Sequence, residues 1–216
     1  MAMYTVLTGA KINVGDFLIT DRAKKLLRKL RPDHELQQLP GWEPLDNHLD
    51  KINAGKALII MGGPGFQPGF YPRVYKLTRN LDDIRVPIVP LGLGWKGYPG
   101  DYSTLKRYRF TAPSLEALRR ISGGISHVSC RDYMTVEVLR RNGIDNALMT
   151  GCPVWYDLDS IGKSFTSPAE IKRLVFTPAQ RSIYRRQVTS ALEALRRLFP
   201  GAERFCSFHR GIDEEN

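Results

Sequence analysis

The residues best suited to chemistry lie where strand-like stretches give way to helix-like ones. The segment KINVGDFLIT, residues 11–20, follows the apolar run YTVLTGA and precedes an amphipathic run. Gly15 permits close approach of a ligand, and the N-terminus of the following helix offers free N–H groups and a positive dipole end. Asn13 could bind a ligand or tie the loop. Asp16 could accept a proton or hold an acceptor hydroxyl, or it could be a structural carboxylate that caps the helix.

Two glycine-rich segments, MGGPGF and GLGWKG, follow later buried strands. In the first, Gly62 and Gly63 suit a loop that lies against a ligand, although the pattern matches neither the dinucleotide fingerprint nor the P-loop. In the second, Gly94 follows an apolar strand, and Lys96 could meet an anion or simply be an exposed lysine. Both segments fall at strand ends, where ligands bind in open α/β sheets.

A fourth segment, SCRD, precedes another helix-like run. Arg131 could bind a carboxylate or a phosphate bidentately, whereas Asp132 is expected to cap the helix that begins at residue 133. The two could equally form an Arg–Asp tie without a ligand. The three cysteines, Cys130, Cys152 and Cys206, are far apart and form no CxxC pair. This spacing argues against a disulfide framework and a zinc site, and a buried structural cysteine is the commoner case.

Strand-like and helix-like runs alternate along most of the chain. Continuous apolar strands that alternate with helices indicate a doubly wound parallel, Rossmann-like α/β sheet. Ser114 is expected to be the N-cap of its helix. The expected strands are 4–10, 34–40, 56–63, 86–95, 127–132 and 146–153, and the expected helices are 16–30, 43–55, 71–81, 114–123 and 133–143.

The alternation stops at a segment rich in Gly, Ser and Pro. We therefore expect an N-terminal Rossmann-like domain over 1–155, a linker over 156–171 and a partial second α/β domain over 172–216. In the latter, a strand over 172–179, a helix over 181–199 and a strand over 203–209 are expected. Three elements make a small core, so the chain is expected to be truncated within that domain or to pack it on the first.

The formal charge of +10 favours an anionic partner such as a phosphate, nucleic acid, anionic polymer or membrane surface. The basic residues are dispersed over helix faces, and no nucleic-acid motif is present, so we expect no nucleic-acid partner. No apolar run reaches the length of a membrane span and no signal peptide is recognised. The expected compartment is the cytoplasm, with peripheral membrane association left open.

Taken together and in order, five segments resemble the motifs of the polysaccharide pyruvyl transferase family. In this sequence Cys152 stands where that family commonly has an aspartate, and Pro64 interrupts a run that is often three glycines. The segments are NVGDFLI (13–19), IIMGGPGF (59–66), PLGLGWKG (90–97), SCRDYMTVEVLRRNGI (129–144) and MTGCPVW (149–155).

The resemblance implies a two-domain, GT-B-like enzyme that moves a pyruvyl group from phosphoenolpyruvate to a sugar of a glycan, forming a ketal. It implies that the segment Asn13–Asp16 forms the floor of the acceptor site, with Asp16 acting on the sugar hydroxyl. Donor groups are expected mainly from the C-terminal domain. His209 and Arg210 follow an expected strand and could face the cleft, or they could be exposed polar residues. This chemistry requires no metal or cofactor.

Two other classes of function remain open. The chain could be a non-catalytic or vestigial binding domain that lacks the donor half, as the expected truncation and Cys152 would suggest. It could also be a nucleotide-sugar glycosyltransferase of GT-B type. Donor preference separates the enzyme classes, and the presence of a complete second domain separates an enzyme from a relic.

Overall fold

In this computed structural model, residues 2–9, 13–98, 100–179 and 182–208 are described. The chain forms two compact units. The first consists of Met1–Lys11 and Asp16–Ile161, and the second of Ile12–Gly15 and Gly162–Asn216. The first unit carries the large sheet.

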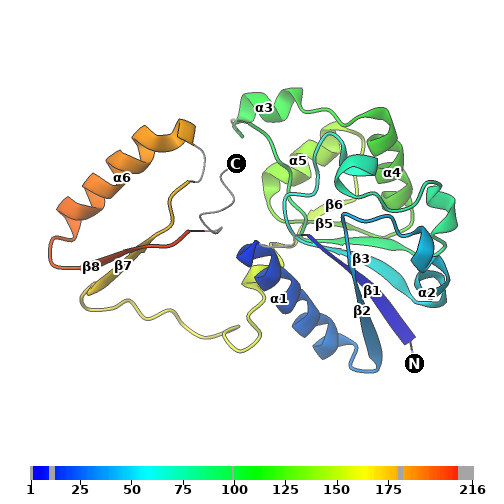
Figure 1. Cartoon of the computed structure of the whole chain (residues 1–216), viewed down its shortest axis with the longest axis horizontal. Helices are drawn as coiled ribbons and strands as arrows, with labels where there is room; N and C mark the ends of the chain where they lie inside the picture. The colour runs from blue at the N-terminus through cyan, green and yellow to red at the C-terminus, as the bar shows by residue number, and fades with distance from the viewer. Residues whose placement is uncertain (1, 10–12, 99, 180–181, 209–216) are drawn as a thin grey trace. The chain divides into compact units, whose positions relative to one another are not determined.

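Four parallel strands in the order β2-β1-β3-β4 form the main sheet of the first unit (Figure 1). A shorter parallel pair, β5-β6, continues it, because Leu93 just beyond β4 bridges Cys130 of β5. The α/β class and the parallel sheet are thus confirmed. The strands are β1 (Ala2–Thr8), β2 (His34–Pro40), β3 (Ala57–Met61), β4 (Ile88–Leu91), β5 (Val128–Cys130) and β6 (Ala147–Met149).

Helices pack on both faces of this sheet. Ile19 and Ala23 of α1 pack on Val6, Ile59 and the other side chains of one face. The opposite face includes Leu7, Leu58 and Ile60. These side chains belong to a larger apolar cluster that also contains residues of α2, α3, α4 and α5. Both faces of the central strands are therefore buried, which explains their continuous apolar sequences. The helices are α1 (Val14–Leu30), α2 (Leu49–Ala54), α3 (Tyr102–Arg107), α4 (Ala112–Gly123) and α5 (Tyr133–Arg141).

The helix expected over 71–81 is absent, and this prediction was wrong. Only one wide turn forms, Phe70–Val74, and Tyr71 inside it has extended backbone angles. The cause is Pro72, which has no N–H to donate and pushes the residue before it out of the helical region. Leu77 follows with a left-handed φ of 47°, so the chain between β3 and β4 crosses as an irregular segment.

Two smaller expectations also need correction. Ser114 is not the N-cap of α4, because the helix starts at Ala112 after Thr111. Instead, buried Ser114 uses its hydroxyl to clamp the Tyr71 backbone, accepting from its N–H at 3.1 Å and donating to its carbonyl at 2.9 Å. The short helix α3 was not expected, although Asp101 caps it with a hydrogen bond from Thr104 N–H of 2.7 Å.

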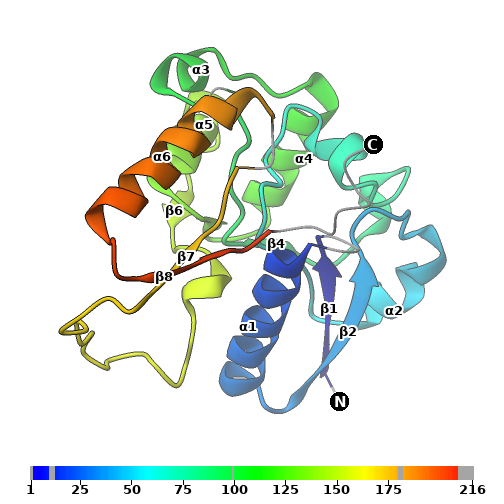
Figure 2. The same ribbon diagram turned by 60° about the vertical axis from the view of Figure 1, so that its left-hand side comes forward.

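The described residues of the second unit form a β-α-β motif, labelled in Figure 2. Strands β7 (Arg173–Phe176) and β8 (Glu203–Cys206) pair in parallel, and α6 (Arg185–Leu198) connects them. Leu192 and Leu195 of α6 face Leu174 and Phe176 of β7 across a small apolar pocket. These three elements are the ones expected from the sequence. The GT-B-like arrangement stays a prediction.

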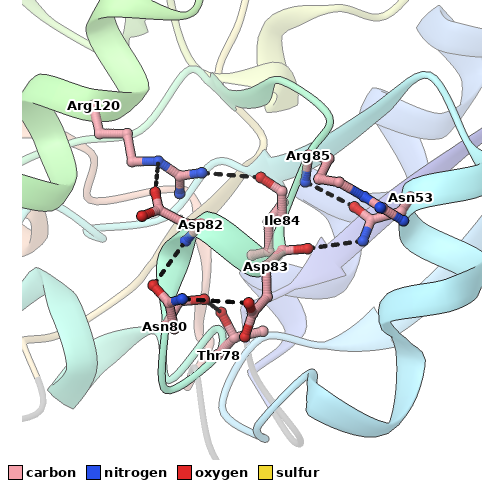
Figure 3. Close-up of polar contacts among 8 residues, drawn as sticks. All are labelled: Asn53, Thr78, Asn80, Asp82, Asp83, Ile84, Arg85 and Arg120. Atoms are coloured by element: carbon pink, nitrogen blue, oxygen red, sulfur yellow. Dashed lines mark hydrogen bonds and ion pairs between the residues drawn. The ribbon is translucent and has the colours of Figure 1, made fainter.

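The irregular crossover is anchored where it returns toward the start of β4 (Figure 3). Asn53 of α2 donates from Nδ2 to the Asp83 carbonyl and accepts from Arg85 N–H, both at 2.8 Å. From the other side, Arg120 of α4 donates to the Ile84 carbonyl at 3.0 Å and pairs with Asp82 at 3.3 Å. Side chains of two helices thus satisfy backbone groups of the segment just before β4, which has no regular secondary structure to pair them.

We expect Asn53→Ala to lower the free energy of unfolding by about 1–2 kcal/mol, because it leaves a carbonyl and an N–H of the crossover without their partner. Chemical denaturation measures this change. Asn47→Ala, which removes an exposed asparagine from the turn just before α2, is the matched control and should be nearly neutral. Equal effects of the two substitutions would show that the Asn53 contacts do not hold the crossover.

Candidate active site

The candidate site lies at the carboxyl edge of the sheet, between β1 and β3. These strands are neighbours, but the chain leaves β1 toward β2 on one side and leaves β3 toward β4 on the other. Such a reversal of strand order leaves a crevice beyond the strand ends, where open α/β sheets bind ligands. Asp16 follows β1, and Gly62 and Gly63 follow β3.

The carboxylate of Asp16 lies beside the backbone of two loops, the one after β1 and the one after β3. Asp16 is half-buried in the first turn of α1. A methyl group built on Gly63 would lie 3.5 Å from Asp16 Oδ1, and one built on Gly9 would lie 3.6 Å from the same oxygen. A negative charge at this end of a helix is stabilised by the helix dipole. The switch point therefore presents an oriented carboxylate that could accept a hydroxyl proton.

Gly62 allows α1 to approach the end of β3. Its φ is +53°, which disfavours L side chains, and a methyl group there would lie only 2.4 Å from Ile19 Cγ2. Ile19 is itself buried on the sheet. The glycine therefore fixes how closely Asp16, one turn earlier on the same helix, can sit to the β3 loop.

Asn13 and Gly15 are joined to each other at the start of α1. The Asn13 side-chain oxygen accepts a hydrogen bond of 2.8 Å from Gly15 N–H. This is the bond that an N-cap residue makes, so Asn13 ties the loop, and Asp16 is a first-turn carboxylate instead of the cap. A ligand contact of Asn13 or Gly15 stays a proposal.

The glycine loops after β3 and β4 pair with each other beyond the sheet. Gly94 N–H donates to the Gly63 carbonyl at 2.8 Å, and Phe66 N–H donates to the Gly94 carbonyl at 3.0 Å. Phe66 and Trp95 continue this pairing as a parallel bridge. Because each loop satisfies the other's backbone, both are held in place without a ligand.

Arg131 rests on this paired structure. The backbone N–H of Arg131 donates to the Leu93 carbonyl at 2.8 Å. Its guanidinium lies so close to Gly94 that a methyl group added to Gly94 would be 2.3 Å from Arg131 Cζ. Its Nε donates to Asp132 Oδ2 at 3.2 Å. Asp132 also accepts from Thr135 N–H at 2.7 Å, which confirms it as the N-cap of α5. The ion pair between Arg131 and Asp132 is thus present, and the Arg131 side chain is 34% exposed.

Lys96 extends from the same loop with an exposed side chain. Its carbonyl accepts from the hydroxyl of Tyr108 at 3.2 Å, and the same hydroxyl donates to the Phe66 carbonyl at 2.8 Å. Burial raises the pKa of Tyr108 to about 12, so this hydroxyl remains a donor at neutral pH. The structure therefore brings Gly94 and Arg131 together and leaves the Lys96 amine at the surface.

Tyr75 is a residue of the site that sequence reasoning missed. Its ring is buried, and its hydroxyl would lie 2.6 Å from a methyl group on Gly65. Burial, and secondly the negative charge of Asp16, hold the pKa of Tyr75 well above its usual range. A neutral phenol thus supports the glycine loop near Asp16. No sequence signal marked it, because Tyr75 fell within the helix wrongly expected over 71–81.

A hydroxyl pair behind the β4 loop was also missed. Ser129 Oγ accepts from Gly92 N–H at 2.7 Å and lies 2.5 Å from Thr150 Oγ1. The loop after β6 also lies close to Gly92, since a methyl group on Gly92 would be 2.4 Å from the Gly151 carbonyl oxygen. Local sequence gives no signal for such contacts, because the partners lie in β5 and in the loops after β4 and β6.

The cysteines show no sign of nucleophilic chemistry. Cys130 is fully buried, and burial raises the pKa of its thiol to about 12. Cys152 is half-buried and packs against the cluster under α1. Cys206 is exposed on β8. Over the described ranges, no group of three or more His, Cys, Asp or Glu residues could hold a metal ion.

Two of the candidate residues, His209 and Arg210, lie outside the residues that the structure describes. Among the helices that it does describe, none combines the length and apolar character needed to cross a bilayer.

Comparison with known proteins shows the family of the chain. The family model for polysaccharide pyruvyl transferase matches residues 13–205, so the chain belongs to the polysaccharide pyruvyl transferase family. A search of the curated proteins found no match. A solved structure of an uncharacterised protein from Klebsiella pneumoniae is 14% identical with a TM-score of 0.46, and the match covers 84% of this chain and 61% of that one. The chain thus spans less than two thirds of that protein.

We expect Gly62→Ala to lower the free energy of unfolding by about 2–4 kcal/mol, because it combines left-handed backbone strain with a clash against Ile19. Thermal or chemical denaturation measures the loss. Gly123→Ala on α4, where no heavy atom lies within 4 Å of the added methyl, is the control and should be neutral or slightly stabilising. A Gly62→Ala protein as stable as the control would mean that α1 does not depend on this close approach.

Proposed function

We propose that this chain takes part in moving a pyruvyl group from phosphoenolpyruvate to a sugar of a glycan, which forms a cyclic ketal. The family match over residues 13–205 is the observation that carries this proposal. Asp16 at the switch point of the sheet supports it, because the reaction needs a base beside the acceptor hydroxyl.

The chemistry defines what the protein must supply. One sugar hydroxyl adds to C2 of phosphoenolpyruvate while a general acid protonates its methylene carbon. A second hydroxyl then displaces phosphate, so two C–O bonds form and the C2–O bond to phosphate breaks. One of the two hydroxyl protons is balanced by the new methyl C–H, and the other leaves with the phosphate. A base for the hydroxyls and cations for the carboxylate and phosphate are therefore required.

In this proposal Asp16 receives the proton of the attacking hydroxyl. Gly62 and Gly63 let the sugar approach the backbone beside it, and Asn13 and Gly15 form the floor at the start of α1. Support comes from the position of the Asp16 carboxylate within reach of two glycine loops. The expected N-terminal domain, residues 1–155, would then be the acceptor half of the enzyme.

Arg131 and Lys96 are the cations that we assign to donor anions from this half. The side chain of Arg131 is partly exposed and its guanidinium is held against Gly94, so it can pair with a second anion besides Asp132. We further propose that His209 and Arg210 approach the donor from the second α/β domain in a GT-B-like arrangement. The boundaries 1–155, 156–171 and 172–216 and a cytoplasmic location belong to this proposal.

Asp16→Asn should reduce kcat for pyruvyl transfer by about 10²–10⁴-fold, since the amide keeps the shape of the carboxylate but cannot take a proton. Phosphate release from phosphoenolpyruvate in the presence of acceptor glycan measures it. Asp21→Asn on the exposed side of α1, where Asp21 pairs with Lys25 at 2.9 Å, is the matched control and should leave kcat unchanged. Near-normal turnover in Asp16→Asn would remove Asp16 from the mechanism.

Arg131→Ala should weaken phosphoenolpyruvate binding by about ten-fold, because it removes a charge-assisted donor while Asp132 still caps α5. Calorimetric titration measures this, with a nucleotide sugar as the comparison ligand and Arg119→Ala, an exposed arginine of α4, as the control. A lower melting temperature with unchanged binding would make Arg131 structural. Tighter binding of the nucleotide sugar than of phosphoenolpyruvate would overturn the proposed donor.

A further inference from the structure

The irregular crossover between β3 and β4 forms one wall of an open groove of about 760 Å³. This volume is in the range of sites that bind small molecules. The opposite wall comes from the segment after β2. The groove is lined by Pro44, Asp46, Tyr71, Pro72, Lys76, Thr78 and Arg79.

The walls of the groove are fixed in place. Leu45 N–H donates to the Leu77 carbonyl at 2.6 Å, and both side chains are fully buried, so the two segments are joined through the core. Tyr71 is held at its backbone by Ser114 and at its hydroxyl, which donates to the Thr78 carbonyl at 2.7 Å. A ligand would therefore meet a preformed surface.

The backbone at the centre of this wall is strained. Leu77 adopts a left-handed φ of 47°, which costs a branched residue about 1–2 kcal/mol, and buried packing maintains it. The residues on either side, Lys76 and Thr78, both line the groove. Strain of this kind is concentrated at functional sites, where it places side chains that a relaxed chain would not bring together.

The groove carries two cations, Lys76 and Arg79, that have no direct ion-pair partner among the described residues. Eight ion pairs are found elsewhere in the described part of the chain. Asp46 is the one carboxylate of the lining, so the groove is positive by one charge. An anionic group on the ligand would pair with these cations, and the carboxylate could accept ligand hydroxyls.

The apolar part of the lining suits a sugar ring. Tyr71, Pro44 and Pro72 offer flat, partly exposed surface next to the charged groups. A saccharide combines such needs, because its ring has apolar C–H faces and its rim has hydroxyl groups. A free inorganic anion would leave this surface unused.

The same crossover also reaches the candidate active site. Tyr75, which lies between the groove residues Pro72 and Lys76 in sequence, supports the glycine loop near Asp16. We propose that this groove binds an anionic sugar unit of the acceptor glycan, one that bears a carboxylate or a phosphate, outside the sugar that reacts. This inference rests on the proposed function, since a glycan acceptor presents several sugars at once.

The test is a titration of the isotope-labelled full chain, followed by the backbone amide signals of Tyr71, Lys76, Thr78 and Arg79 in NMR spectra. The ligands are glucuronate, glucose 6-phosphate, neutral methyl glucoside and inorganic phosphate. We expect saturable shifts of the groove signals with at least one of the two anionic sugars, and the stronger of them identifies the anionic group. Affinity should fall as salt is added.

Neutral methyl glucoside bound as tightly as both anionic sugars would overturn the role of charge. Inorganic phosphate bound as tightly as glucose 6-phosphate, with no shift from glucuronate, would overturn the saccharide assignment. Absence of groove shifts with every ligand would overturn the site itself.

Substitutions of the two groove cations test whether they bind the anionic sugar. Lys76→Gln combined with Arg79→Gln should weaken binding of the anionic sugar by about ten-fold without changing the melting temperature. Arg73→Gln, an exposed arginine of the same segment that does not line the groove, is the control and should bind normally. Equal binding by the double variant and the control would refute the proposal. The groove titration uses neither phosphoenolpyruvate nor turnover, so the Asp16→Asn protein should still bind the anionic sugar in the groove. A failure of the groove proposal can therefore be distinguished from a failure of the proposed transfer reaction.

Discussion

The close approach of α1 to the end of β3 is the constraint on which the candidate site depends. Ile19 packs where a side chain on Gly62 would have to lie, and Asp16 is carried into the switch point by the same helix. A larger residue at position 62 would separate helix from loop and move the carboxylate. The glycine is therefore needed for packing first, and the geometry of the site follows from that packing.

The loops after β3 and β4 add a second element of preorganisation. Their backbones hydrogen-bond to each other beyond the sheet, and this paired structure supports the guanidinium of Arg131. In the reaction that we propose, a donor with two anionic groups must be held while a hydroxyl attacks. A site that is already ordered loses less conformational entropy when its ligands bind.

The crossover between β3 and β4 shows how one local break has several structural consequences. Pro72 prevents a helix, so the segment follows an irregular path. This path places Tyr75 against the glycine loop after β3 and leaves Lys76 and Arg79 in the lining of the groove. Side chains of α2 and α4 then supply hydrogen bonds to the backbone of the segment just before β4. The same feature thus connects stability with the surface that we assign to the acceptor glycan.

The sequence by itself determined the alternation of elements. Apolar strand runs and amphipathic helix runs are local patterns, so the parallel α/β class, β2 at 34–40 and the Asp132 cap could all be predicted from neighbouring residues. The ordered motifs likewise indicated the family, and the family model bears this out. Pro72 is visible in the sequence as well, and its missing N–H and its effect on Tyr71 are incompatible with the helix predicted over 71–81.

Only the tertiary structure decided which strand ends become neighbours. Contacts such as Asp16 with Gly63, Arg131 with Gly94 and Ser129 with Thr150 join residues far apart in the chain, and no local preference encodes them. Tyr75 and the groove were invisible for the same reason, since their positions depend on packing between segments after β2 and β3. Strand order is set by the burial of both sheet faces at once, which is a property of the folded whole and not of any one segment.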